Sequence, residues 1–206
     1  MPTILQIDSS PRAASVSSSL AAKFVEGLKK KDSAAVVYHR NTTLEKLPYI
    51  DEPTLAAFFG QPAETLSTEQ KQVLALSDNL IDELLAADTI VLGVPMWNLG
   101  IPASLKSWVD LISRAGRTFK YTAGGGIESL VPAGKKVIVV ASRGGAYPEG
   151  SPWAAYNQVD PYLRTIFGFF AITDVTFVYV DNQNRSGDAP AEALAEAEKQ
   201  IAALLA

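Results

Sequence analysis

The sequence predicts an α/β fold in which a parallel β-sheet lies between two layers of helices. Short, almost continuously apolar segments alternate five times with longer segments of helical periodicity along the 206 residues. Continuous apolar strands are typical of a sheet that is buried on both faces. Because 48% of the residues are hydrophobic, the chain can form a sizeable core, and we expect one domain over residues 1–206.

Five segments have the length and composition of strands. Each is rich in Val, Ile or Leu, and the first, TILQID, runs directly into Ser, Ser and Pro. The predicted strands are residues 3–8, 34–38, 88–94, 136–142 and 175–180.

The segments between the strands carry signals for helix ends. Ser15 precedes apolar residues at helical spacing and suits an N-cap, and Ser67 with Gln70 has the capping-box pattern. Pro102 is suited to open a helix, and Gly116 is suited to the position just past its end. The predicted helices begin near residues 16, 68, 102, 161 and 190.

Two segments show no regular period. Residues 47–62 are rich in Pro and Gly, and residues 123–132 are rich in Gly. We expect both to be irregular excursions that help to build a substrate pocket rather than linkers between domains.

Five strands in about 200 residues suit a doubly wound sheet of the flavodoxin-like order 2-1-3-4-5. In such sheets the ligand binds beyond the carboxyl ends of the strands, near the switch point between the first and third strands. The loops after strands one, three and four are therefore expected to form one site.

The charge balance argues against general nucleic-acid binding. Eighteen Lys and Arg residues face 22 Asp and Glu residues, which gives a net charge of -4 and a pI near 5.1. A local basic patch near the loops is still compatible with this balance. Its candidate members are Arg12, Arg114, Arg117 and Arg143.

The chain is poor in reactive side chains. It contains no cysteine, which excludes disulfides, thiolate metal sites and iron–sulfur clusters. Its single histidine, His39, is predicted at the end of the second strand, away from the loops, and we interpret it as structural. We expect no metal site, and a cofactor is expected to supply the redox chemistry.

No segment predicts a membrane or export function. No run approaches the roughly 18 apolar residues of a membrane span. The first ten residues, MPTILQIDSS, lack the features of a signal peptide. We therefore expect a cytoplasmic protein that contacts neither membrane nor nucleic acid.

The loop after the first strand is rich in hydroxyl groups. It contains Ser9, Ser15 and Ser17 and leads into a predicted helix. Hydroxyl groups and free backbone N–H groups at a helix N-terminus bind phosphate without a lysine. The loop has neither a Walker A pattern nor the Gly-x-Gly-x-x-Gly pattern of dinucleotide sites, so a monophosphate suits it better than a pyrophosphate. The alternative interpretation is a Ser-rich turn with an N-cap.

The loop after the third strand is framed by two prolines and contains Met96, Trp97, Asn98 and Leu99. A flat ring can pack on the indole and the thioether while the amide of Asn98 binds its polar edge. The alternative is a loop that only covers the core.

The loop after the fourth strand contains Ser142, Arg143, Gly144 and Gly145. Paired glycines allow a backbone to approach a ligand closely, although an ordinary turn also uses them. Arg143 suits either the attraction of an anionic cofactor or an ion pair with a carboxylate. Together the three loops offer a phosphate cradle, a stacking wall and a row of backbone donors, which are the parts that FMN requires.

Several longer motifs follow one another in the order found in one known family. They are PMWNL at 95–99, RAGRTFKYT at 114–122, SRGG at 142–145 and FGF at 167–169. In these motifs the chain resembles the bacterial FMN-dependent NADH-azoreductases, which are flavodoxin-like NAD(P)H:quinone oxidoreductases. The resemblance runs from Ser9 to about Val180. It departs where the usual Tyr-Asn-Phe is Trp97-Asn98-Leu99 and where the usual acidic-Gly pair is Asp181-Asn182.

The resemblance implies a homodimer with an FMN at each of two interface sites. It implies phosphate contacts from Ser9, Ser15, Val16 and Ser17. It implies ring contacts from residues 96–99 and 142–145, and a substrate side lined by Tyr121 and Phe169. NADH or NADPH is then the electron donor and a quinone or azo compound the acceptor, which use one flavin face in turn in a ping-pong mechanism.

Two alternative functions stay open from the sequence. A flavodoxin-type FMN electron carrier fits the same three loops, although the two irregular excursions exceed what such a carrier needs. An NAD(P)H:FMN reductase that releases its flavin is the second alternative. The sequence does not distinguish NADH from NADPH.

Overall fold

The computed structural model describes all 206 residues and confirms the predicted flavodoxin-like α/β fold. A five-stranded parallel sheet has the order β2-β1-β3-β6-β7, which is the predicted order 2-1-3-4-5 when only its own strands are counted. A separate two-stranded antiparallel sheet, β4-β5, lies outside it. The main-sheet strands are β1 (Thr3–Asp8), β2 (Val36–Asn41), β3 (Thr89–Pro95), β6 (Lys136–Ser142) and β7 (Asp174–Val180).

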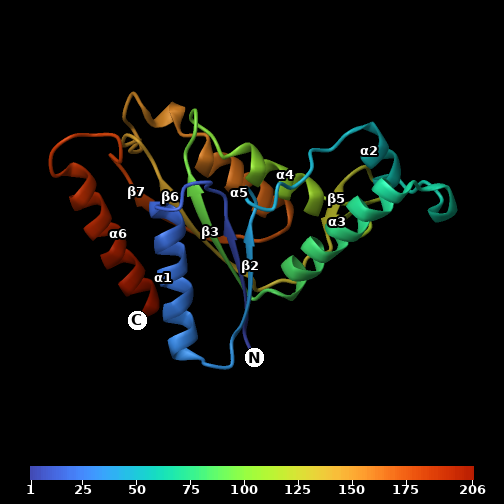
Figure 1. The fold of residues 1–206 in the computed structure, drawn as a ribbon, viewed down its shortest axis with the longest axis horizontal. Helices are drawn as coiled ribbons and strands as arrows, with labels where there is room; N and C mark the ends of the chain where they lie inside the picture. Colours follow the sequence, from blue (N-terminus) through green and yellow to red (C-terminus); the bar gives the residue numbers. More distant parts are fainter.

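Helices cover both faces of the sheet (Figure 1). One face carries α1 and α6, and the other carries α3, α4 and α5. The helices are α1 (Val16–Lys31), α2 (Glu52–Phe58), α3 (Thr68–Ala86), α4 (Ala103–Ile112), α5 (Val159–Phe169) and α6 (Ala189–Leu205). The strands β1, β3 and β6 are almost completely buried, which agrees with their continuous apolar sequences.

The predicted helix starts that rest on capping side chains are confirmed. Ser15 is the N-cap of α1, and its side chain accepts a hydrogen bond from the Ser18 N–H. Ser67 and Gln70 form both bonds of the capping box at the start of α3. Local side-chain chemistry therefore sets these boundaries.

Several predicted boundaries are wrong. The second strand begins at Val36 rather than residue 34 and extends to Asn41, and α5 begins at Val159 rather than Pro161. The helix α4 ends at Ile112, so Gly116 is not its terminal residue. Gly116 instead has a φ of 80° in the turn before β4, where its N–H donates to the Phe119 carbonyl.

The two segments expected to be irregular contain short elements. The first includes α2, which begins with Asp51 as N-cap and Pro53 in its first turn. The second includes the hairpin of β4 (Phe119–Tyr121) and β5 (Ile127–Ser129). Elements of three to seven residues are too short for a periodic signal.

None of the helices combines the length and apolarity that a membrane span requires.

Candidate cofactor site at the carboxyl edge of the sheet

The N-terminus of α1 lies at the carboxyl edge of the sheet and is free to bind an anion. The backbone N–H groups of Val16 and Ser17 have no hydrogen-bond partner in the chain, and the first turn contains no acidic residue. Free N–H groups at a helix N-terminus, together with the helix dipole, favour a negatively charged ligand. The main-chain geometry therefore fits the predicted phosphate cradle.

Gly93 in β3 allows α1 to lie close to the sheet. A Cβ atom at Gly93 would stand 2.5 Å from Asp8 Oδ1 and 3.1 Å from the Cα atom of Ser18. The second distance involves the helix backbone, which a side chain at position 93 would push away. The glycine thus fixes the position of the helix N-terminus over β1 and β3.

The serine side chains of the first loop are used largely within the chain. Ser9 is fully buried and donates to the Gly93 carbonyl at 3.0 Å, while Ser15 Oγ and Ser17 Oγ lie 3.2 Å apart. Ser17 is also fully buried. Among the four predicted phosphate residues, only the Ser9 N–H is paired, and the backbone N–H groups of Ser15, Val16 and Ser17 are left without a partner.

The loop after β3 contains a tight turn with a strained backbone. The N–H and carbonyl groups of Trp97 and Gly100 bond each other at 3.0 and 3.1 Å. Between them Asn98 and Leu99 have φ values of 46° and 74°. Two consecutive positive φ angles define a type I′ turn, in which Gly and Asn are favoured. A leucine there costs roughly 1–2 kcal/mol, and such strain is concentrated at ligand sites.

The same turn presents side chains to solvent. Trp97 and Leu99 are 42% and 40% exposed, whereas Met96 is half-buried and packs against the core. The Met96 N–H donates to the Ser142 carbonyl at 2.8 Å, which joins the loops after β3 and β6. The predicted ring-binding loops are therefore neighbours in the structure.

The loop after β6 supplies backbone donors but not a free cation. The N–H groups of Gly144 and Gly145 have no partner in the chain. The guanidinium of Arg143 is 4% exposed and forms an ion pair with Asp181, with Nε 2.6 Å from Oδ1. Of the two interpretations of Arg143, the structure supports the ion pair.

A hollow of about 140 Å³ opens where these loops meet, and we call it the loop hollow. It brings together predicted residues from all three loops and adds residues that sequence reasoning missed. The loop after β7 was not predicted to contribute to the site. The loop hollow is lined by Ser10, Arg12, Ser15, Val16, Pro95, Trp97, Ser142, Gln183 and Asn184.

Arg12 is the cation of the loop hollow. No carboxylate pairs with its side chain, which is exposed. By contrast, Arg114 and Arg117 both pair with Asp78 on α3. The prediction that these four arginines form one basic patch is therefore wrong. Arg12 could be singled out from the sequence only because it lies in the Ser-rich loop after the first strand.

His39 lies nearer to the site than predicted. Because β2 continues to Asn41, His39 pairs with Gln6 in the sheet, and its Nε2 lies 2.7 Å from Asp8 Oδ2. Asp8 directly precedes Ser9. The histidine orients a buried carboxylate under α1, which agrees with a structural interpretation but not with a remote position.

Tyr121 and Phe169 lie away from the loop hollow. They belong to an aromatic cluster, defined here as Phe119, Tyr121, Phe169 and Phe170, in which Phe119 lies 5.5 Å from Tyr121 and 4.9 Å from Phe169. The cluster follows the far ends of α4 and α5, which both lead away from the carboxyl edge (Figure 1). The ten residues of α4 alone span about 15 Å.

The parallel sheet of order β2-β1-β3-β6-β7, with the unpaired N–H groups of a helix start at its carboxyl edge, defines a flavodoxin-like protein. A model of the flavodoxin-like fold family matches residues 2–205, and the chain belongs to this family.

The curated relatives share one kind of name. The chain is 45% identical over 207 residues to an FMN-dependent NADH:quinone oxidoreductase of Nostoc, which covers 100% of this chain and 99% of that protein. It is 46% identical over 204 residues to a protein of the same name from Paraburkholderia phymatum, covering 98% and 100%.

Solved structures agree with these relatives. An azoreductase from Bacillus anthracis superposes with a TM-score of 0.89 at 30% identity and covers 100% of this chain and 99% of that chain. An FMN-dependent NADH-azoreductase from the same species, in complex with FMN, gives 0.86 at 26% identity, covering 99% and 100%. The predicted resemblance to the azoreductase family is confirmed.

Proposed function

We propose that the chain is an FMN-dependent NAD(P)H oxidoreductase that reduces quinones and azo compounds. The observation that carries this proposal is the pair of unpartnered N–H groups at Val16 and Ser17, which open beside a hollow bounded by the strained Trp97–Gly100 turn. The relatives at about 45% identity are FMN-dependent NADH:quinone oxidoreductases by name, which supports the same class of enzyme.

The residues present fit one phosphate group and one flat ring. The two free N–H groups and the side chain of Arg12 suit a phosphate dianion. The exposed indole of Trp97 and the amide of Asn98 suit the ring, and the free N–H groups of Gly144 and Gly145 suit its polar edge. The site thus matches FMN better than a dinucleotide flavin.

Held by these loops, FMN would supply the redox chemistry between NAD(P)H and the acceptor. The chain binds and orients the cofactor through the loops and shields part of it from water. No histidine or carboxylate lines the loop hollow, so we assign the protons of the acceptor to solvent. In this proposal no side chain forms a covalent bond to the substrate.

We further propose that a second copy of the chain completes the substrate side. Tyr121 is 65% exposed and follows the C-terminal end of α4, whereas Trp97 of its own loop hollow precedes the start of that helix. A two-fold symmetric dimer places the aromatic cluster of one copy over the loop hollow of the other.

Other large aromatic side chains are exposed, as is typical of a surface that binds a partner. They are Tyr49, Phe59, Trp153 and Tyr156. Phe58, by contrast, packs against the core beneath Arg114. The remaining aromatic surface is still large for a monomer.

Under this arrangement donor and acceptor share one slot between the ring and the aromatic cluster. Two flat molecules do not fit in it together, so the oxidised nucleotide leaves before the acceptor binds. Initial rates against NADH at several quinone concentrations should then give parallel lines. Intersecting lines would indicate a ternary complex and two separate sites.

We place the enzyme in the cytoplasm, where its nucleotide donor is available.

The decisive experiment is anaerobic reduction of the purified protein by NADH and by NADPH, followed by addition of a quinone. The proposal expects co-purified FMN, fast bleaching by a nucleotide and fast recovery with the quinone. A flavin that does not bleach with either nucleotide would favour an electron carrier. Loss of flavin during purification, with activity only on added FMN, would favour an FMN reductase.

A further inference from the structure

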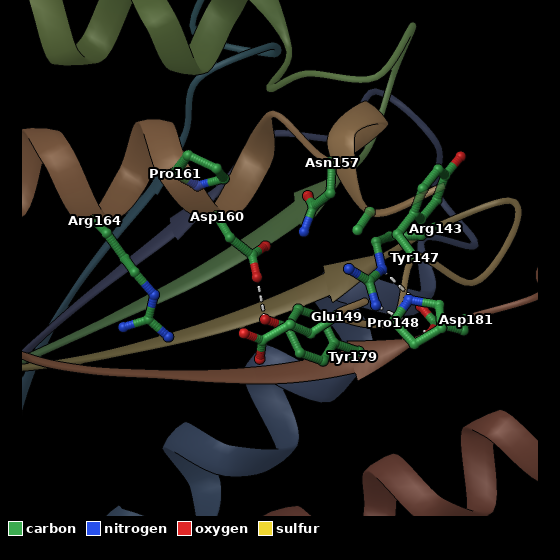
Figure 2. Close-up of a pocket in the computed structure, with 11 residues that line it drawn as sticks. Arg143, Tyr147, Pro148, Glu149, Asn157, Asp160, Pro161, Arg164, Tyr179 and Asp181 are labelled. Atoms are coloured by element: carbon green, nitrogen blue, oxygen red, sulfur yellow. Dashed lines mark hydrogen bonds and ion pairs between the residues drawn. The ribbon is translucent and has the colours of Figure 1, made fainter. Parts of the chain in front are cut away.

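The side chain of Arg143 does not line the loop hollow but a second, larger cavity, which Figure 2 shows. This cavity has a volume of about 540 Å³ and lies between α5 and the ends of β6 and β7. The guanidinium and Asp181 form two hydrogen bonds there, Nε to Oδ1 at 2.6 Å and Nη2 to Oδ2 at 3.0 Å. This fork-to-fork arrangement fixes the plane of the guanidinium as well as its distance.

Two tyrosines add to this restraint. The guanidinium carbon lies 3.9 Å from the ring centroid of Tyr179 and 5.5 Å from that of Tyr147. The Tyr179 hydroxyl donates to Asp160 in the first turn of α5, and burial together with this bond raises the pKa of Tyr179. Arg143 is thereby tied to β7 and, through Tyr179, to α5.

The backbone around Arg143 is tied to the same neighbours. The Arg143 N–H donates to the Val180 carbonyl at 2.9 Å, and its carbonyl accepts from the Gln183 N–H at 3.0 Å. The next carbonyl, of Gly144, accepts from the Asn184 N–H at 3.2 Å. A fourth bond, from the Asn182 N–H to the Gly145 carbonyl at 3.5 Å, also joins the loops after β6 and β7.

The side chain of Asn184 packs directly on Gly144. A Cβ atom at position 144 would stand 2.6 Å from Asn184 Nδ2 and would make the amide of Asn184 turn away. Asn184 in turn lines the loop hollow. Through this contact the position of the β6 loop sets one wall of the cofactor site.

We propose that the Arg143–Asp181 ion pair is a positioning element that holds the free N–H groups of Gly144 and Gly145, and the neighbouring Asn184, in place for the bound flavin. The proposal rests on the proposed function in that it takes FMN as the ligand. It assigns to Arg143 an action through the backbone rather than direct contact with the cofactor.

Burial makes the pair act as one unit. A guanidinium that is 4% exposed keeps its charge out of water only while a carboxylate faces it. Removal of either partner leaves the other charge uncompensated, and that side chain must turn toward water and take its loop with it. The loops after β6 and β7 then shift relative to each other, although the sheet beneath them is unchanged.

The test measures the affinity of the apo-protein for FMN by quenching of flavin fluorescence, and the midpoint potential of the bound flavin. We expect Arg143→Gln, and also Arg143→Lys, to raise the FMN Kd by about tenfold or more, because a lysine cannot form the fork. Backbone donors favour the redox state with more negative charge, so the midpoint potential should become more negative. Asp181→Asn should behave in the same way.

Arg164→Gln is the matched control. Arg164 lines the same cavity and also lies over an aromatic ring, that of Phe177 at 4.6 Å, but it contacts neither loop. Its substitution should leave the FMN Kd within about twofold and the potential unchanged.

The double variant Arg143→Gln with Asp181→Asn keeps the test valid if a single variant fails to fold, because it leaves no unpaired charge. The FMN Kd should rise no further in the double variant than in the stronger single variant. Folded variants with a wild-type Kd and potential would overturn the positioning proposal. Wild-type apo-protein that does not bind FMN would instead overturn the proposed function.

Discussion

The carboxyl edge of the sheet and the aromatic cluster differ in how completely one chain builds them. At the edge, fully buried serines, a strained turn and a buried ion pair hold the loops in fixed positions. In the aromatic cluster, the side chain of Tyr121 is 65% exposed and forms no hydrogen bond, and its ring meets Phe119 edge-on at 5.5 Å. One region is preorganised within the chain, and the other exposes Tyr121 at the rim of buried aromatic rings. Under the proposed function, this difference means that one copy binds the cofactor, whereas the substrate side requires a second copy.

The largest expected effect concerns the N-terminus of α1. Val16→Pro removes one free N–H group at the first helical position, where proline is well tolerated and where Ser15 already has extended geometry. Loss of one hydrogen bond to a charged group should cost roughly 1.5–3 kcal/mol, or about ten- to a hundred-fold in FMN affinity.

Val16→Ala is the control for that change, because it shortens the side chain and keeps the N–H group. The FMN Kd of Val16→Ala, measured by fluorescence titration, should be at least severalfold lower than that of Val16→Pro and close to the wild-type value. Equal losses in the two variants would mean that the side chain, and not the backbone donor, matters at this position.

A second test moves the whole helix. Gly93→Ala places a methyl group against the α1 backbone and should destabilise the fold by about 1–3 kcal/mol through overpacking. It should also weaken FMN binding, since the cradle shifts with the helix. Gly124→Ala is the matched control, because nothing lies within 4 Å of its Cβ position. Thermal unfolding with and without FMN measures both effects, and equal stability of the two variants would contradict the close packing.

A third test separates the two regions. Tyr121→Ala should change neither stability nor FMN affinity by more than about 0.5 kcal/mol, because the side chain is exposed. It should raise the KM for a quinone by about two- to tenfold, the value of an aromatic stacking contact. Steady-state kinetics gives the KM, and an unchanged value would remove Tyr121 from the substrate side.

The smallest effect is expected in the strained turn. Leu99→Gly relieves a positive φ angle and should raise the free energy of unfolding by up to about 1 kcal/mol. Leu99→Asn should give part of the same gain, since asparagine tolerates this conformation. Urea unfolding of the apo-protein measures both, and a loss of stability would show that the side chain contributes more by packing than it costs in strain.

The sequence predicted those features of the two regions that depend on neighbouring residues in the chain. The N-cap Ser15, the capping box at Ser67 and the apolar strands are set by neighbouring residues, so they were predicted correctly. The turn at Asn98 was placed in the site, but its strained φ angles depend on the paired bonds of Trp97 and Gly100.

Long-range features were not predictable in this way. The pairing of Arg143 with Asp181 joins residues 38 positions apart, and Asn184 reaches the loop hollow only because β7 lies beside β6. His39 was misplaced because its strand is three residues longer than its apolar part. The position of Tyr121 depends on the direction of α4, which a motif match does not contain.

The φ of 61° at Asn182, where the family has Gly, explains why asparagine is accepted there.

The most direct test of the central claim mixes two chains that are each impaired in a different part of the site. A Val16→Pro chain binds FMN about ten- to a hundred-fold more weakly but keeps Tyr121, whereas a Tyr121→Ala chain binds FMN normally but lacks that side chain, so the mixture is assayed at an FMN concentration that loads only the second chain. If the site is shared between two copies, a refolded mixture should recover a wild-type KM for the quinone in the fraction of mixed dimers, with one competent site in each. If Tyr121 serves its own chain, or the protein is an active monomer, the mixture should show only the activities of the separate variants, and the shared-site account would be wrong.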